Sequence, residues 1–188
     1  MSCLPHDSIS TLKKHIKNPS FQHFAKEAYK APDGYALRLN RDTGKTEMFV
    51  AGTRDRDQWL LNAWDAFMMS PANYTGIHTG KEVEWLDPWR HEKQKMYGAI
   101  ANDNNVDVIY GHSRGGALVA DMPLHPCTQR VGLDAAMVLA SNKKMLNLTE
   151  AGTCNPTGLF DAGIGKTGKK NVSVDYSYWN PHKVWFVS

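Results

Sequence analysis

The sequence lacks any long hydrophobic run. None of its 188 residues belong to a stretch approaching the ~18 apolar residues that a membrane-spanning helix needs. The first residues, M-S-C-L-P-H-D, also lack a basic segment followed by an apolar stretch, which a secretory signal would require. These two absences argue against a membrane-spanning or secreted protein and predict a cytoplasmic or otherwise intracellular location.

The sequence also has few cysteines and a small net charge. The three cysteines, Cys3, Cys127 and Cys154, are odd in number and lack metal-ligand spacing, so we expect reduced thiols rather than a disulfide framework. The net charge of +3 is mild and no long basic tract is present, so nucleic acid is not an expected partner. No repeat or low-complexity linker divides the chain, which predicts a single domain over residues 1–188.

The periodicity of apolar residues predicts an α/β fold. Strand-like runs alternate with helical runs after residue 46, which indicates a mainly parallel central sheet covered by helices on both faces. Short N-terminal helices and a hairpin precede it, and residues 147–170 have little periodicity. The expected helices are 8–17, 21–29, 56–67, 92–102 and 117–122, and the expected strands are 35–40, 46–51, 106–110, one within 130–139, 171–178 and an edge strand at 184–187.

A serine flanked by glycines follows one of these strands. The segment V-D-V-I-Y-G-H-S-R-G-G (106–116) leads from a strand into a helix, and G-x-S-x-G in that setting is the pattern of a nucleophile elbow. Side chains at Gly111 and Gly115 would collide with the neighbouring strand and helix, so glycine is expected at both positions. The following helix would direct its amide hydrogens toward an oxyanion beside Ser113. Ser113 is therefore the candidate nucleophile.

Three segments in order extend this pattern. F-V-A-G-T-R-D-R-D-Q-W-L-L-N (49–62), G-I-H-T-G (76–80) and G-H-S-R-G-G-A-L-V (111–119) together resemble the class 3 lipases of the α/β-hydrolase superfamily. The resemblance covers about residues 46–122. It implies an α/β-hydrolase-like fold and an esterase or lipase activity with no metal or organic cofactor.

The resemblance also implies an oxyanion hole. Thr53 would supply one donor through its backbone N–H and Arg114 the other through its own. The chain departs from the family at Arg114, which stands where an apolar residue is usual and is compatible with a polar or anionic substrate. Lys81 and Asn62 also differ from the family pattern and look like packing differences. His78 precedes the elbow, where the family does not place its base, so a packing role is expected for it.

A catalytic triad also needs a base and an acid, which in this fold follow the serine in the order acid, then histidine. His182 comes after the last strong strand, whereas His125 ends the elbow helix and is expected at the far edge of the sheet, so His182 is the candidate base. Asp175, at the end of the last strand, is the candidate acid, with Asp161 as the alternative. Asp134 is a third candidate, which would serve only if R-V-G-L-D (130–134), rather than the longer run to residue 139, is the strand.

The resemblance implies a lipid or small-ester substrate, either an acylglycerol or a phospholipid, and a transient contact with a membrane or micelle. The segment 67–77 is a candidate lid. One competing pattern, G-I-G-K-T-G-K-K (163–170), nearly matches a phosphate-binding loop but lacks its final hydroxyl residue and a preceding strand. The other alternative is a hydrolase-like binding or structural domain without activity. Neither the oligomeric state nor the acyl-chain preference follows from the sequence.

Overall fold

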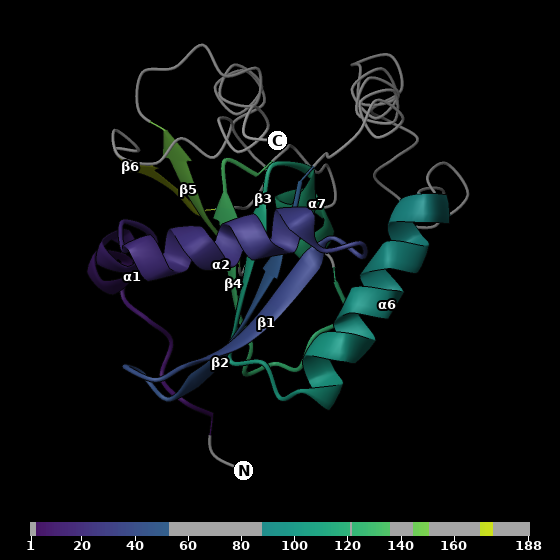
Figure 1. Cartoon of the computed structure of the whole chain (residues 1–188), viewed down its shortest axis with the longest axis horizontal. Helices are drawn as coiled ribbons and strands as arrows, with labels where there is room; N and C mark the ends of the chain where they lie inside the picture. The colour runs from purple at the N-terminus through teal and green to yellow at the C-terminus, as the bar shows by residue number, and fades with distance from the viewer. Residues whose placement is uncertain (1–2, 53–87, 121, 136–144, 151–169, 175–188) are drawn as a thin grey trace.

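One six-stranded sheet organises the protein. The computed structural model describes residues 3–52, 88–120, 122–135, 145–150 and 170–174. The sheet order is β1-β2-β3-β4-β5-β6; β1 is antiparallel to β2, and every other neighbouring pair is parallel (Figure 1). The strands are β1 (Tyr35–Asn40), β2 (Lys45–Val50), β3 (Val108–His112), β4 (Gln129–Leu133), β5 (Leu146–Glu150) and β6 (Lys170–Val174), and the helices are α1 (Ile9–Ile16), α2 (Pro19–Lys30), α6 (Pro88–Asp103) and α7 (Arg114–Ala120).

The two N-terminal helices begin at side-chain caps. The Ser8 hydroxyl accepts a hydrogen bond from the Thr11 N–H at the start of α1, and the Asn18 side chain accepts one from the Ser20 N–H at the start of α2. Such caps satisfy amide hydrogens that have no partner within the helix. The predicted pair of short helices is confirmed, and α2 is longer than expected because Pro19 is accommodated in its first turn.

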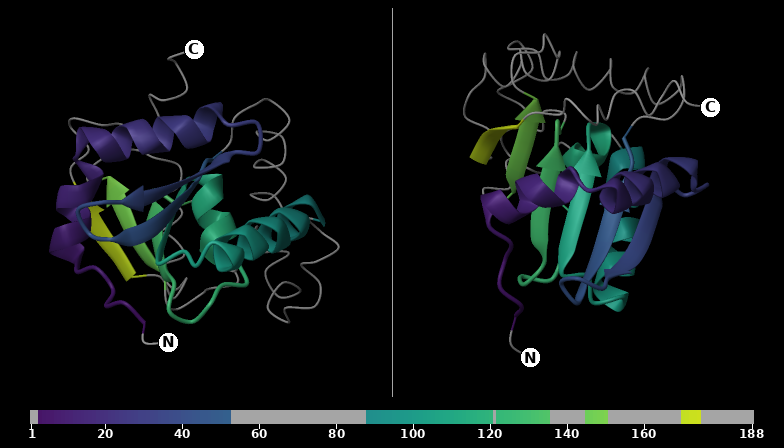
Figure 2. Two further views of the ribbon diagram at one scale, coloured as in Figure 1. Left: turned by 60° about the horizontal axis from the view of Figure 1, so that its bottom comes forward. Right: turned by 60° about the vertical axis from the view of Figure 1, so that its left-hand side comes forward.

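Helices cover both faces of the sheet. The α1–α2 pair lies on one face, and α6 and α7 lie on the other (Figure 2). Successive residues of β2 alternate between the two cores: Phe49 packs with α1 and α2, whereas Met48 and Val50 pack with α6 and α7. A strand segment buried on both faces is expected to be apolar, as Met48, Phe49 and Val50 at the end of β2 are. The expected mainly parallel sheet with helices on both faces is thus confirmed for the described residues.

The hairpin of β1 and β2 was also predicted correctly. Its loop ends at Gly44, whose φ of +69° lies in the region that favours glycine. Tyr35 pairs with Val50 and Asn40 pairs with Lys45, so the strands differ from the predicted ones by no more than one residue at each end.

Several predicted boundaries were wrong. Strand β3 was expected to end at residue 110 but continues to His112, and helix α7 begins at Arg114 rather than at residue 117. Residues 147–170 were expected to be irregular, yet Leu146–Glu150 form β5, paired with both β4 and β6. Five residues offer too little alternation to be recognised, and pairing on both sides stabilises the strand instead. The predicted helix 56–67 and edge strand 184–187 lie outside the described residues.

The prediction of reduced thiols was wrong for two of the three cysteines. Cys3 and Cys127 form a disulfide, with their Cα atoms 5.2 Å apart. Separation along the chain, 124 residues, concealed the pairing, because connectivity cannot be read from spacing alone. Disulfides are typical of oxidising compartments, so the thiols no longer support the predicted intracellular location. Among the described residues, no helix is long and apolar enough to cross a membrane.

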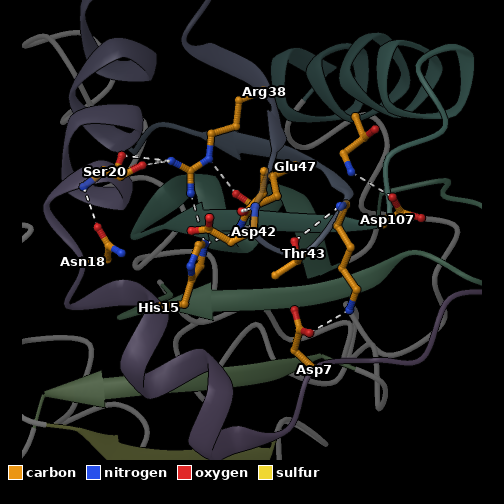
Figure 3. A network of polar contacts seen from close by, with 12 residues as sticks. Asp7, His15, Asn18, Ser20, Arg38, Asp42, Thr43, Glu47 and Asp107 are labelled. Atoms are coloured by element: carbon orange, nitrogen blue, oxygen red, sulfur yellow. Dashed lines mark hydrogen bonds and ion pairs between the residues drawn. The ribbon is translucent and has the colours of Figure 1, made fainter.

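A polar network lies between α1 and the hairpin (Figure 3). The Glu47 carboxylate is 2.6 Å from Arg38 Nε and 3.0 Å from His15 Nε2, and it also accepts a hydrogen bond from Asn40. Burial by itself would raise the pKa of Glu47, but the hydrogen bonds from His15, Asn40 and Arg38 and the charge of His15 outweigh it, so the pKa is lowered. Lys45 pairs with Asp7 nearby, at 2.7 Å.

Candidate functional site

Ser113 stands at the corner between β3 and α7. It is half-buried, and its φ of +50° is strained for a residue with a side chain. Its N–H donates to the Leu133 carbonyl at 3.0 Å, and its own carbonyl accepts hydrogen bonds from Gly116 and Ala117, which start the helix. The strand, the strained serine and the helix follow one another without a spacer, as in a nucleophile elbow.

The glycines on either side of Ser113 are sterically required. A Cβ at Gly111 would lie 2.5 Å from the Gly115 carbonyl oxygen, and a Cβ at Gly115 would lie 2.3 Å from the Val50 carbonyl oxygen. Real Cβ atoms do not approach backbone atoms so closely, so only glycine lets β3, α7 and β2 pack at these distances. The sequence-based interpretation of Gly111 and Gly115 is confirmed.

The end of β2 lies against the elbow. A Cβ at Gly52 would stand 2.8 Å from the His112 carbonyl oxygen and 3.1 Å from Ser113 Cβ. Val50 pairs with Gly111, so the chain leaving β2 emerges at the same edge of the sheet as Ser113. Gly52 is the last described residue before Thr53, the proposed oxyanion donor, which lies outside the described residues together with the rest of 53–87.

Helix α2, which covers one face of the sheet, contacts both Gly52 and His112 through Tyr29. The Tyr29 hydroxyl accepts a hydrogen bond from the Gly52 N–H at 3.0 Å and is also hydrogen-bonded to His112 Nδ1. His112 is completely buried and immediately precedes Ser113. Sequence reasoning missed Tyr29, because nothing in its helical segment distinguishes it from an ordinary half-buried tyrosine.

Asp134 follows the strand beside the elbow. Strand β4 ends at Leu133, which pairs with His112, so Ser113 and Asp134 are the next residues on two adjacent strands. The condition that the sequence sets for Asp134 as the acid is therefore met. Its φ is +44°, its side chain is 1% exposed, and its N–H donates to the Leu148 carbonyl at 2.9 Å. A strained, buried carboxylate next to a strained serine is typical of functional sites.

One further carboxylate was missed. Glu150 is the last residue of β5 and pairs with Val174 at the end of β6, so it belongs to the same edge of the sheet. The carboxyl ends of β3, β4 and β5 point the same way in Figure 1. Glu150 could have been considered only with β5 recognised as a strand. In parallel sheets this edge is the usual place for a binding site.

The remaining predicted residues are not brought together by the described part of the chain. His182, Asp175, Asp161 and His78 all lie outside it, as does the candidate lid at 67–77. Asp175 directly follows Val174, the last residue of β6, and Asp161 falls between β5 and β6 in the sequence.

Two described candidates can be placed directly. His125 precedes β4, whose first residue Gln129 pairs with Val108 at the start of β3, so it lies at the edge opposite Ser113, as predicted. Arg114 begins α7, and its side chain is only 3% exposed. A polar substrate would have to enter the protein interior to reach that guanidinium, so the position of Arg114 favours a role for its backbone.

The phosphate-loop pattern is not supported by its surroundings. In such loops the lysine and hydroxyl residues open a helix, whereas Lys170 begins strand β6. Among the described residues, no group of three or more His, Cys, Asp or Glu side chains is arranged to hold a metal ion.

Comparison with known proteins gives two viral relatives. The chain is 35% identical over 207 residues to "Viral protein 1" of Chaetoceros diatodnavirus 1, covering 88% of this chain and 54% of that protein. It is 30% identical over 108 residues to "Viral protein 1" of Chaetoceros protobacilladnavirus 2, covering 55% of this chain and 49% of that protein. The chain thus spans about half the length of the curated relatives it matches. No protein-family model and no solved structure matches it.

Proposed function

We propose that the protein is a serine hydrolase that cleaves carboxylic ester bonds of lipids, either acylglycerols or phospholipids. The observation that carries the proposal is the corner at Ser113: a positive φ of 50° between a parallel strand and a helix, with glycine required on both sides. Backbone strain of this kind costs about 1–3 kcal/mol and clusters at active sites, so it supports a functional role for the Ser113 hydroxyl. The similarity of three sequence segments to class 3 lipases supports the same reaction.

The reaction follows the general scheme of acyl transfer. His182 takes the proton from Ser113 Oγ as the oxygen attacks the ester carbonyl carbon, and the backbone N–H groups of Thr53 and Arg114 stabilise the oxyanion. His182 then gives this proton to the alcohol oxygen as the ester C–O bond breaks, which leaves the acyl group on Ser113. It next takes a proton from water as the water oxygen bonds to the acyl carbon, and it returns that proton to Ser113 Oγ as the bond between Oγ and the acyl carbon breaks and the carboxylic acid leaves. No cofactor takes part in these steps.

The positions of Gly52 and Arg114 support the proposed oxyanion donors. A Cβ at Gly52, the residue before Thr53, would lie 3.1 Å from Ser113 Cβ. Arg114 follows Ser113 directly, so its N–H is held covalently next to the nucleophile. In α/β-hydrolases the residue after the nucleophile supplies one backbone donor, and a loop that follows another strand supplies the second.

The acid of the triad is proposed from position. Asp175 and the alternative Asp161 remain the sequence-based candidates. Asp134 and Glu150 are added by their places at the edge that carries Ser113. Of the four, Asp134 is one strand from the serine and its carboxylate is buried, as the acid of a triad usually is.

Labelling of Ser113 with a fluorophosphonate probe tests the proposal. The wild-type protein should be labelled once per chain at Ser113, Ser113→Ala should not be labelled, and the label should block hydrolysis of p-nitrophenyl esters. We expect short esters to be turned over faster than long ones, with S113A as the blank. A folded wild-type protein that never becomes labelled would overturn the proposed hydrolase activity and favour a hydrolase-like binding domain.

A further inference from the structure

The hydroxyl of Tyr29 joins the two turns of the proposed site. It contacts Gly52, which precedes the oxyanion residue Thr53, and His112, which precedes Ser113. These contacts come from a helix 83 positions earlier in the chain than His112. One oxygen atom on α2 therefore touches the backbone of one turn and the side chain that leads into the other.

The two contacts meet at one oxygen atom. A phenol has one proton to donate and can accept hydrogen bonds through its oxygen. The Tyr29 oxygen accepts from the Gly52 N–H and shares a second hydrogen bond with His112 Nδ1. The His112 ring is completely buried, and this hydrogen bond holds its orientation immediately before Ser113.

The support of the hydroxyl is itself rigid. Tyr29 is the second-last residue of α2, which is fixed to the sheet by four buried residues, Phe21, Phe24, Ala25 and Ala28. The space around Gly52 is also full, since a Cβ there would lie 2.9 Å from the Tyr29 hydroxyl and 2.8 Å from the His112 carbonyl. The two turns therefore cannot move independently while the hydroxyl remains in place.

We propose that Tyr29 is a positioning residue, which holds the end of the chain leaving β2, at Gly52, against the elbow at His112 and Ser113. The role rests on the proposed function, because it concerns the backbone geometry around that nucleophile. Tyr29 touches no reacting atom. It acts by holding Gly52 and His112 at a fixed separation beside Ser113.

Tyr29→Phe tests this role because it removes only the hydroxyl. Misplacing catalytic groups by ~1 Å can cost up to ~10²-fold in rate. We therefore expect kcat, calculated per active site as counted by labelling a parallel sample, to fall about tenfold to a hundredfold. KM should stay within about twofold, because the oxyanion hole acts on the transition state more than on the bound substrate. Labelling by the fluorophosphonate should slow by a similar factor. Tyr35→Phe is the matched control, because it removes the same hydroxyl from a tyrosine that packs against the core on the other face of the sheet. Its kcat, KM and labelling rate should match those of the wild type.

Each outcome decides a different question. If wild type is labelled and Y29F is labelled equally fast, the positioning role is wrong and the hydrolase stands. If Y29F shows fewer labelled sites at an unchanged rate per site, the hydroxyl only stabilises the fold, and the role is again wrong. If folded wild type is never labelled, the proposed function fails and this role fails with it.

A nitrogen NMR measurement gives a second readout that needs no activity. In the wild-type protein, the signal of His112 Nδ1 should report its hydrogen bond to the Tyr29 hydroxyl. In Y29F the Nδ1 signal and the Gly52 amide signal should both shift, while both should be unchanged in Tyr35→Phe. His112 and Gly52 signals that are the same in Y29F as in the wild type would overturn the positioning role, because the hydroxyl would then not join the two residues.

Discussion

Gly52 lies so close to Ser113 that a Cβ built at position 52 would stand 3.1 Å from the Cβ of the serine. The two residues are 61 positions apart in the sequence and come together because Val50 pairs with Gly111 on adjacent parallel strands. The residues that follow β2, as far as Gly52, therefore lie against the elbow that follows β3, at the carboxyl edge of the sheet.

Replacing Gly52 with alanine should separate these turns. The added methyl group would meet the His112 carbonyl oxygen at 2.8 Å, so the backbone has to move. We expect a loss of unfolding free energy of about 1–3 kcal/mol, as for other overpacked sites. The rate of Ser113 labelling should fall by more than the loss of folded protein explains. Urea titration and probe kinetics measure the two effects separately.

Gly44→Ala is the matched control for this change. Gly44 also needs its glycine, because its φ is +69°, but nothing lies within 4 Å of a Cβ there. Its substitution should lower stability by about 1 kcal/mol through backbone strain alone. Labelling of Ser113 should keep its wild-type rate. Equal slowing in both variants would mean that G52A acts through global stability rather than through the site.

The elbow could be predicted from sequence because its residues are contiguous. Strand, glycine, serine and glycine occur within 106–116, and steric requirements act over a few positions. Tyr29 could not be predicted in the same way, since its contacts with Gly52 and His112 depend on how α2 crosses the sheet. The disulfide of Cys3 and Cys127 and the short strand β5 were missed for the same reason: each is stabilised by partners distant in sequence.

Neutralising the proposed acid of the triad should nearly abolish the proposed activity. In a serine hydrolase, replacing this aspartate with asparagine lowers kcat by ~10⁴-fold, because the imidazole takes the wrong tautomer. We expect Asp134→Asn to have the largest effect, since β4 adjoins the elbow strand. By contrast, β6 lies three strands away, at ~4.8 Å per strand. The measurement is kcat for a short ester as a function of pH.

Three other substitutions serve as comparisons for Asp134→Asn. Asp175→Asn, Asp161→Asn and Glu150→Gln should each change kcat by less than about tenfold. If D175N or D161N is the inactive variant and D134N is active, the sequence-based acid is correct and the positional assignment is wrong. Melting curves of all four variants show whether any loss of activity follows from loss of fold.

Glu47→Gln should destabilise the protein in a pH-dependent way. The pKa of Glu47 is lowered in the folded protein relative to 4.5, so its charged form contributes stability above the unfolded pKa. That contribution is lost as the pH falls through the folded value. At pH 7 we expect E47Q to lose about 1–3 kcal/mol of unfolding free energy, and the gap to wild type should narrow below pH 4.5.

The exposed pair of His23 and Glu27 provides the control. The Glu27 side chain is 58% exposed, so Glu27→Gln should change stability by no more than about 0.5 kcal/mol at either pH. Urea midpoints at pH 7 and pH 3.5 are sufficient for the comparison. A gap between E47Q and wild type that is the same at both values would show that packing, rather than charge, dominates at Glu47.

Tyr110→Phe should be neutral or stabilising. The Tyr110 hydroxyl is buried and finds no hydrogen-bond partner in the part of the chain that the structure describes. Burial, and then the charges of Glu47 and Asp7, raise the pKa of this phenol well above 10, so it stays neutral at physiological pH. Removing an unsatisfied buried hydroxyl should raise the unfolding free energy by up to about 1 kcal/mol.

Tyr97→Phe removes the same group but should have the opposite effect on the unfolding free energy. The Tyr97 hydroxyl donates to the Asp33 carbonyl, and the residue is 4% exposed. Its loss should lower the unfolding free energy by about 1 kcal/mol or more. Thermal melts of the two variants beside wild type test the pair. A Y110F variant as destabilised as Y97F would show that the Tyr110 hydroxyl has a partner.

Reduction of the disulfide should lower stability while leaving the sheet intact. Cys3 and Cys127 enclose a long loop, and opening such a loop typically costs about 2–5 kcal/mol of unfolding free energy. The N-terminal segment remains held by the ion pair of Asp7 with Lys45 and by hydrogen bonds between Asp7 and Gln129. Urea unfolding with and without reductant measures the cost. In Cys3→Ser the reductant should have no further effect; an undiminished response in that variant would mean that the reductant acts elsewhere.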